Sequence, residues 1–232
     1  QAHKKKYGNR DTKELLHELK EGRRTCDELV FTGGEVTIRD DLFYLIRYAT
    51  KLGYKNIQLQ SNCRMLAYKD YCKKLIKAGV NEFSPALHGH TKEVHDYLTR
   101  ADGSFEQTTR AIKNLSELGQ YIITNTVVVE PNYRYMPQLA QLFVKLGVHQ
   151  YQLAFMHAVG NAWEYIDEMM PRVSEAAPYI HKALKIGIDN NVKCMAEAMP
   201  FCVMKGYEKY CSEHYIPSTE IRDKDSYDQA FE

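Results

Sequence analysis

One pattern recurs along most of the chain and restricts its fold more than any other feature. An amphipathic stretch ends in Lys-Leu-Gly or a close variant, and an apolar, β-branched or aromatic run follows within a few residues. Glycine just past a helix adopts the left-handed conformation without steric cost, and a short loop then leads into a strand. The pattern therefore predicts helix-to-strand junctions at four glycines: Gly53, Gly79, Gly119 and Gly147.

Six apolar runs are predicted to be strands that alternate with helices. Their spacing of roughly thirty to forty residues favours a parallel sheet with right-handed crossovers, in a barrel or a doubly wound arrangement. No Gly-x-Gly-x-x-Gly opens a helix, so we expect a full or partial (βα) barrel with its functional residues at the strand ends. The predicted strands are Leu29–Thr32, Ile57–Gln60, Glu82–Leu87, Tyr121–Val129, Tyr151–Met156 and Val192–Ala196.

The composition is that of a globular protein and argues against several classes of function. Among 232 residues, 31 Lys+Arg balance 30 Asp+Glu, so nothing indicates a nucleic-acid-binding or membrane-binding surface. No run approaches the roughly 18 apolar residues of a membrane-spanning helix. The six cysteines are scattered rather than arranged as a disulfide framework, so we expect a reducing, cytoplasmic location.

Small and polar residues follow the first two predicted strands. Gly33 and Gly34 allow a ligand to approach the backbone closely, and the adjacent Glu35 carboxylate suits an ammonium group. Ser61 and Asn62 end the second strand with a hydroxyl and an amide, which suit the hydroxyl groups of a ribose. A structural interpretation stays open for both places, namely a tight turn before a helix at the first and an Asx turn at the second.

Histidines and amides occupy the later strands. His88 and His90 are two residues apart, so an extended backbone would point both to one side, and His157 follows another strand. The three are a candidate metal site, although ordinary hydrogen-bonding histidines fit the same pattern. Asn125 and Gln152 lie within apolar runs, where a buried amide needs either a ligand or a core network as its partner.

Taken in order, these residues resemble the radical S-adenosylmethionine (radical SAM) superfamily, from about Asp11 to Pro217. The resemblance implies a TIM-like partial (βα) barrel and an enzyme that cleaves S-adenosylmethionine reductively at a [4Fe–4S] cluster. The resulting 5′-deoxyadenosyl radical would then abstract a hydrogen atom from the substrate. The most specific stretches are Val30–Glu35, Phe83–Asp96 with Leu98-Thr99, Gly103–Thr108, Ile123–Val128 with Asn132-Tyr133, and Pro200–Cys202.

The resemblance also implies which residues bind the cofactor. Gly33, Gly34 and Glu35 match the motif that binds the methionine amino group. Ser61 and Asn62 stand near the ribose and the carboxylate. It does not identify catalytic residues. The further cofactor-binding candidates are His88, Asn125, Gln152 and Val159, the last in a segment where backbone contacts to adenine are usual.

The iron–sulfur ligands are the main departure from the family pattern. The Cys-x-x-x-Cys-x-x-Cys motif is absent, and only Cys26 precedes Gly33. We therefore expect the cluster ligands and the first βα unit upstream of residue 1. The chain starts with Gln1 and closes without a helix stop signal, so we expect that both ends have been cut.

Residues 1–198 are predicted to form the barrel, and residues 199–232 to begin a C-terminal extension. Cys202 resembles the first ligand of an auxiliary Fe–S cluster in such extensions, and Cys211 is interpreted as a buried thiol. The resemblance further implies a reductant protein of the flavodoxin or ferredoxin type. It leaves the substrate open between a peptide or protein and a small metabolite or cofactor precursor.

Two other functions remain open at this point. A metal-dependent barrel hydrolase would use His88, His90 and His157 around a zinc-type ion, with Glu35 or Asp96 as general base. A non-catalytic barrel would bind S-adenosylmethionine, or nothing, as a scaffold for a partner. The radical SAM interpretation leads because its match is long and ordered, whereas three histidines out of nine arise easily by chance.

Overall fold

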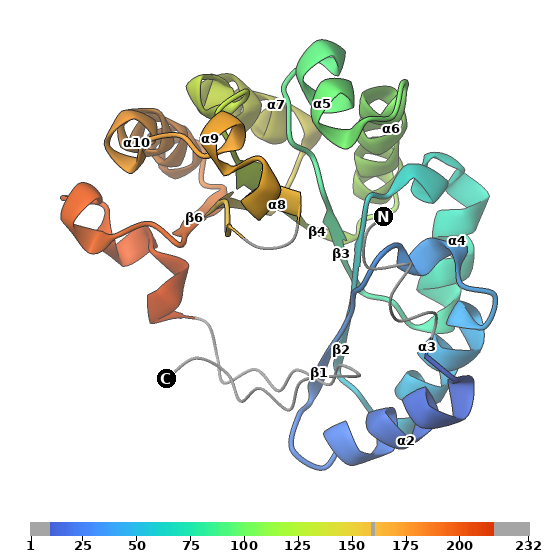
Figure 1. Cartoon of the computed structure of the whole chain (residues 1–232). Coiled ribbons are helices and arrows are strands. Elements are labelled where there is room, and N and C mark those ends of the chain that lie inside the picture. Colours follow the sequence, from blue (N-terminus) through green and yellow to red (C-terminus); the bar gives the residue numbers. More distant parts are fainter. Residues whose placement is uncertain (1–9, 159–160, 216–232) are drawn as a thin grey trace.

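The computed structural model of the chain shows an open, curved sheet whose outer side is covered by helices (Figure 1). It describes residues 10–158 and 161–215. All strands of the sheet are parallel and lie side by side in chain order. This arrangement confirms the predicted partial (βα) barrel. The strands are β1 (Glu28–Phe31), β2 (Asn56–Ser61), β3 (Glu82–Pro85), β4 (Tyr121–Val128), β5 (Gln150–Phe155) and β6 (Lys193–Glu197).

The longer helices bury one face in the core. In α3 (Leu42–Leu52), the buried residues recur at the spacing of a single helical face, and Leu45 and Ile46 are at most 1% exposed. Within the described ranges, no helix is both long and apolar enough to cross a membrane. The other helices are α2 (Thr12–Gly22), α4 (Lys69–Ala78), α5 (Lys92–Thr99), α6 (Ser104–Glu117), α7 (Met136–Leu146), α8 (Asn161–Glu164), α9 (Ile166–Met169) and α10 (Val173–Asp189).

The helix-to-strand junctions lie at the predicted glycines. Gly53 and Gly147 end α3 and α7 with φ angles of 88° and 72°, a left-handed conformation that strains residues with a side chain. Gly119 after α6 adopts the same conformation, with φ at 67°. Gly79 after α4 is restricted further, because a Cβ there would lie 2.0 Å from the Thr50 hydroxyl oxygen. The prediction is confirmed at all four positions.

β3 is shorter than predicted. It ends at Pro85, and Ala86 then makes an isolated bridge to Asn125 of β4. Proline has no N–H to donate, so it interrupts the hydrogen-bond ladder toward β4. The Leu87 N–H donates to the Asn125 carbonyl at 3.2 Å, after which the chain leaves the sheet. The histidines that follow therefore do not stand on a strand.

The two faces of the sheet differ in exposure. On β4, Thr124 and Thr126 are fully buried, whereas Ile123 and Asn125 are half-buried. This alternation follows from the period of two in a strand, with one face under the helices and the other on the concave side (Figure 1). A ligand in this fold therefore meets side chains on the concave face and on the loops after the strands.

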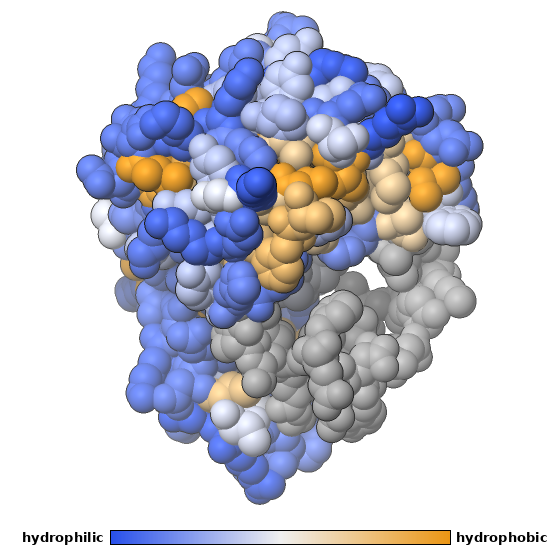
Figure 2. Space-filling model, turned by 90° about the vertical axis from the view of Figure 1, so that its left-hand side faces the viewer, coloured by the Kyte–Doolittle hydropathy of each residue, from blue (hydrophilic) through white to orange (hydrophobic). Residues whose placement is uncertain are grey.

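The segment after β6 packs back onto the barrel. Cys211 makes a parallel bridge to Ala196 of β6, and both residues are fully buried. The Tyr207 ring stacks on His181 of α10, with centroids 4.6 Å apart. Figure 2 shows this side of the molecule, where the surface is mostly hydrophilic and hydrophobic residues gather in its upper half. The described part of the predicted extension shares the barrel core, and a domain boundary at residue 199 stays a prediction.

Candidate functional site

The loop after β1 presents a carboxylate next to open space. Gly33 and Gly34 are exposed, and a Cβ on either would meet no atom within 4 Å. Glu35 follows and caps the short 3-10 helix η1 (Val36–Ile38). Its Oε1 accepts hydrogen bonds from the Thr37 N–H at 3.0 Å and the Thr37 hydroxyl at 2.6 Å. The carboxylate is therefore fixed by the turn that its own loop forms.

The same carboxylate is also bound to the end of β2. The Ser61 hydroxyl donates to Glu35 Oε1 at 2.7 Å, and the Asn62 N–H donates to Oε2 at 2.9 Å. Ser61 Oγ in turn accepts the Cys63 N–H at 2.8 Å. The predicted grouping of Glu35, Ser61 and Asn62 is thus present, but the described contacts run among these residues themselves.

Cys63 occupies a strained backbone position beside this group. Its φ is 58°, the left-handed region in which a side chain costs about 1–2 kcal/mol. Glycine would adopt this conformation without that cost. The Cys63 side chain is fully buried, and burial, followed by the nearby Glu35 charge, raises the pKa of its thiol well above the ordinary range. Cys63 is therefore a protonated packing residue.

Asn62 forms the structural turn that the sequence left open. Its Oδ1 accepts the Arg64 N–H at 3.0 Å, which closes an Asx turn. Its carbonyl accepts the hydroxyl of the buried Thr108 from α6 at 3.0 Å. Thr37 and Thr108 were not singled out from the sequence, although Thr108 belongs to a stretch that carries the family resemblance and Thr37 follows one by two residues. Contacts of Ser61 and Asn62 with a ribose stay a prediction.

Asn125 and Gln152 lie side by side on the concave face. They are Cα partners in the β4–β5 ladder and sit within their strands rather than at the strand ends. The Gln152 amide donates to Glu197 Oε2 at the end of β6. The other oxygen of Glu197 lies 4.0 Å from the exposed His157 Nε2. Glu197 was not singled out from the sequence, because only the strand register places it near Gln152. The roles of Asn125 and Gln152 stay predictions.

The structure does not bring together the three histidines that the sequence left open as a candidate metal site. His88 Nδ1 accepts the Val127 N–H at 3.2 Å, and its ring stacks on His95 at 5.9 Å. His90 instead contacts Tyr135, with ring centroids 4.9 Å apart. In residues 10–158 and 161–215, no three His, Cys, Asp or Glu side chains gather in a way that could hold a metal ion. The backbone after Pro85 is not a strand, so the rings of His88 and His90 contact different partners.

Burial keeps the two stacked histidines neutral. His95 is 1% exposed, and its Nδ1 accepts the His88 N–H at 3.0 Å. Burial lowers the pKa of both His88 and His95 to about 4, and for His95 the neighbouring His88 contributes as well. The proposed contact of His88 with the cofactor stays a prediction.

Asp96, one of the two candidate general bases in the hydrolase alternative, binds the first residues of α6. Its carboxylate accepts the N–H groups of Gly103 and Phe105 and the hydroxyl of Ser104, each at 2.8 Å. Burial alone would raise the pKa of Asp96, but these hydrogen bonds lower it below its ordinary value. Asp96 therefore acts as the cap that starts α6.

The remaining predicted positions are dispersed or lie outside the described ranges. Cys202 is exposed, whereas Cys211 is fully buried, as predicted, and burial raises the pKa of its thiol. Val159 lies outside the described residues. Cys26 is partly exposed before β1. Among the residues that the structure describes, these cysteines join no group of three His, Cys, Asp or Glu side chains that could hold a metal ion.

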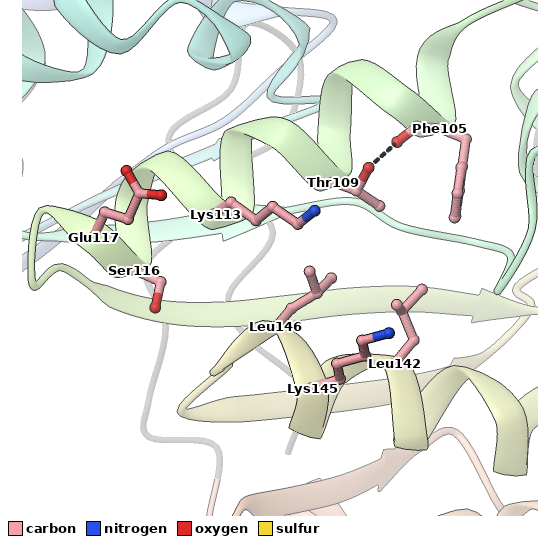
Figure 3. A pocket seen from close by; sticks show the side chains of 8 residues that line it. All are labelled: Phe105, Thr109, Lys113, Ser116, Glu117, Leu142, Lys145 and Leu146. Carbon is pink, nitrogen blue, oxygen red and sulfur yellow. Dashed lines mark hydrogen bonds between the residues drawn. The ribbon is translucent and has the colours of Figure 1, made fainter.

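A groove on the outer, helical side is unrelated to this group. It has a volume of about 380 Å³ and lies between α6 and α7, where Lys113 and Lys145 approach it from opposite sides (Figure 3). Phe105, Leu142 and Leu146 form its apolar wall. Its residues belong to the helices and not to the loops after the strands, so it does not contribute to the candidate site.

The same fold occurs in solved structures of low sequence identity. SuiB of Streptococcus suis, bound to S-adenosylmethionine, superposes with a TM-score of 0.71 at 14% identity, covering 88% of this chain and 48% of SuiB. A domain of a pyruvate-formate lyase-activating enzyme from Bacteroides vulgatus superposes with a TM-score of 0.57 at 16% identity, covering 72% of this chain and 96% of that domain.

Sequence comparisons give closer relatives. An AdoMet-dependent heme synthase of Oleidesulfovibrio alaskensis is 32% identical over 134 residues, which cover 58% of this chain and 34% of the synthase. A probable GTP 3′,8-cyclase of Saccharolobus islandicus is 32% identical over 130 residues, covering 56% of this chain and 41% of the cyclase. The match thus spans less than half the length of these relatives. A sequence model of the radical SAM superfamily matches residues 2–153, more than half of the chain. On the strength of this match, and of the fold that agrees with it, the chain belongs to the radical SAM superfamily.

Proposed function

We propose that this chain binds S-adenosylmethionine at the carboxyl ends of its strands, with the Glu35 carboxylate accepting the methionine amino group. The observation that carries the proposal is the uneven use of the two carboxylate oxygens. From the described residues, Oε1 receives three hydrogen bonds, whereas Oε2 receives one, that of the Asn62 N–H. A carboxylate oxygen accepts about two hydrogen bonds, so Oε2 keeps room for an ammonium donor.

The surroundings of Glu35 fit a zwitterionic ligand. The open space over Gly33 and Gly34 lets the methionine end approach the backbone. Further along the sheet, Asn125, Gln152 and Glu197 offer amide and carboxylate groups on the concave face. These groups suit the ribose and the adenine, and Val159, which lies outside the described residues, completes the proposed set.

The iron–sulfur cluster requires residues beyond those described. Bound to three cysteines, the [4Fe–4S] cluster of this family supplies the electron that cleaves S-adenosylmethionine to a 5′-deoxyadenosyl radical. No cysteine set for it exists among the described residues, so we place its ligands upstream of Gln1. A flavodoxin- or ferredoxin-type protein would deliver the electron. Cys202, which is exposed, is the candidate ligand for an auxiliary cluster.

Two groups of relatives suggest two different classes of substrate. SuiB has been solved with its precursor peptide SuiA, and anSMEcpe with a peptide, so a peptide substrate is one proposal. The curated relatives are a heme synthase and a probable GTP cyclase, so a small metabolite is the other. Hydrogen abstraction from either substrate is the proposed reaction.

The test uses the complete protein, including any residues upstream of Gln1, reconstituted anaerobically with iron and sulfide. S-adenosylmethionine binding is measured by equilibrium dialysis, and 5′-deoxyadenosine is quantified after addition of dithionite. We expect Glu35→Gln to weaken binding roughly tenfold to hundredfold, because it removes a charge-assisted hydrogen bond of about 1.5–3 kcal/mol. Glu28→Gln, on the exposed amino end of β1, is the matched control and should bind normally.

Two results would contradict the proposal in different ways. Equal binding by wild type and Glu35→Gln would remove Glu35 from the cofactor site. Tight binding without iron and without 5′-deoxyadenosine would instead support the alternative of a non-catalytic scaffold that binds S-adenosylmethionine.

A further inference from the structure

The hydroxyls around Glu35 are sheltered from any ligand in the site. Thr37 is 5% exposed and Ser61 is 6% exposed, while Glu35 itself is half-buried. Both hydroxyls donate to the same carboxylate oxygen, Oε1, at 2.6 Å and 2.7 Å. They therefore saturate Oε1 and leave Oε2 as the oxygen with capacity for a further donor.

The hydroxyl of Ser61 already donates one hydrogen bond and accepts another. A hydroxyl has one proton to donate, and that of Ser61 goes to Glu35. Its oxygen also accepts the Cys63 N–H, which lies in a fully buried residue. Donation from Ser61 to a ribose would break the bond to Glu35, so the contact implied by the family resemblance conflicts with the observed geometry.

We infer that Ser61 and Thr37 are positioning residues, which hold the Glu35 carboxylate so that Oε2 meets the cofactor's amino group, and that neither hydroxyl touches the cofactor. The inference rests on the proposed function and specifies how that site works. Thr37 fixes the carboxylate from its own loop, and Ser61 fixes it from the end of the neighbouring strand. With both bonds in place, the carboxylate loses little rotational freedom when the cofactor binds.

The experiment compares binding of S-adenosylmethionine to Ser61→Ala, Thr37→Val and wild type, in the complete reconstituted protein, by equilibrium dialysis. We expect each variant to raise the dissociation constant by roughly threefold to tenfold, the value of about one net hydrogen bond. Ser61→Thr, which keeps a hydroxyl, should recover most of the affinity. Thermal unfolding of every variant separates lost positioning from lost folding.

The matched control is Thr126→Val. Thr126 is also a fully buried threonine, but its hydroxyl donates to the Leu87 carbonyl at 2.7 Å, away from Glu35. This variant should lose stability and keep its affinity for S-adenosylmethionine. A merely structural role of Thr37 would give the same behaviour in Thr37→Val, and that result would overturn the inference.

A second comparison separates positioning from direct contact. In a Glu35→Ala background there is no carboxylate to hold, so Ser61→Ala should change the dissociation constant by less than about twofold. Ser61→Ala could instead raise the dissociation constant by the same factor in both backgrounds, or weaken binding while Thr37→Val leaves it unchanged. Either result would show that Ser61 contacts the cofactor directly, and it would overturn the inference but not the proposed function. A wild-type protein that binds no S-adenosylmethionine would overturn the proposed function together with it.

Discussion

The stability of this protein should fall between pH 6.5 and pH 4 because of the buried His95. Its Nδ1 accepts the His88 N–H at 3.0 Å, so protonation would break that bond and place a charge in a site that is 1% exposed. The pKa of His95 is lowered from 6.5 to about 4, first by burial and then by His88. The unfolded chain therefore binds a proton in this range that the folded chain does not, and stability falls as the pH falls.

The size of the effect follows from the two pKa values. At pH 5 the free energy of unfolding is lower than at neutral pH by about 2 kcal/mol on account of His95, and near pH 4 this loss approaches about 3 kcal/mol. Above pH 6.5 the full stability is present. His88, whose pKa is also lowered to about 4, acts in the same direction. Because the two rings influence one another, their effects are not expected to add in full.

The assay is urea unfolding at several pH values between 7.5 and 4.5, for wild type and His95→Asn. Asparagine keeps an oxygen close to the position of Nδ1 to accept the His88 N–H, but it does not titrate in this range. The difference in unfolding free energy between the two proteins should therefore shrink by about 2 kcal/mol from pH 7.5 to pH 5. The lowered pKa of Asp96 places its own titration below this window. A constant difference across the range would refute the reasoning.

Two further predictions concern single backbone positions. Ala198 follows β6 with φ at 57°, so Ala198→Gly should raise the free energy of unfolding by about 1 kcal/mol, whereas Ala196→Gly, within the strand, should lower it. A Cβ on Gly187 of α10 would lie 2.4 Å from the Tyr151 hydroxyl oxygen and 2.9 Å from Cys194 Sγ. Gly187→Ala should therefore cost about 1–3 kcal/mol in urea unfolding. Gly34→Ala, with no atom within 4 Å, should change stability by less than about 1 kcal/mol, and equal losses in both variants would contradict the argument.

The architecture was predictable because it follows from local chemistry. Glycines that end helices and apolar runs that form buried strands carry their information within a few residues. All six predicted strands are present, and the error at β3 came from Pro85, whose missing N–H shortens the ladder. The candidate three-histidine site depended on a similar assumption, an extended backbone through His88 and His90, whereas the chain has already left the sheet there.

The candidate site was predictable only in part. The sequence indicated that Glu35 and Ser61 would lie at the carboxyl ends of neighbouring strands, and β1 pairs with β2 as expected. It did not indicate that Ser61 donates to Glu35, because this contact depends on the register of the two strands and on the turn after β1. Glu197 is a similar case, since its contact with Gln152 joins residues 45 positions apart.

By itself, the sequence determined the parallel βα order, the helix ends and the chemical types at the strand ends, since each follows from residues close together in the chain. Only the tertiary structure decided which of those groups bind one another and which face open space. That choice depends on strand register and side-chain burial, which link Thr37 and Ser61 to a single oxygen of Glu35 and leave the other oxygen bound by the Asn62 N–H. Hydrogen-bond partners distant in sequence are set by packing, and packing is a property of the whole fold.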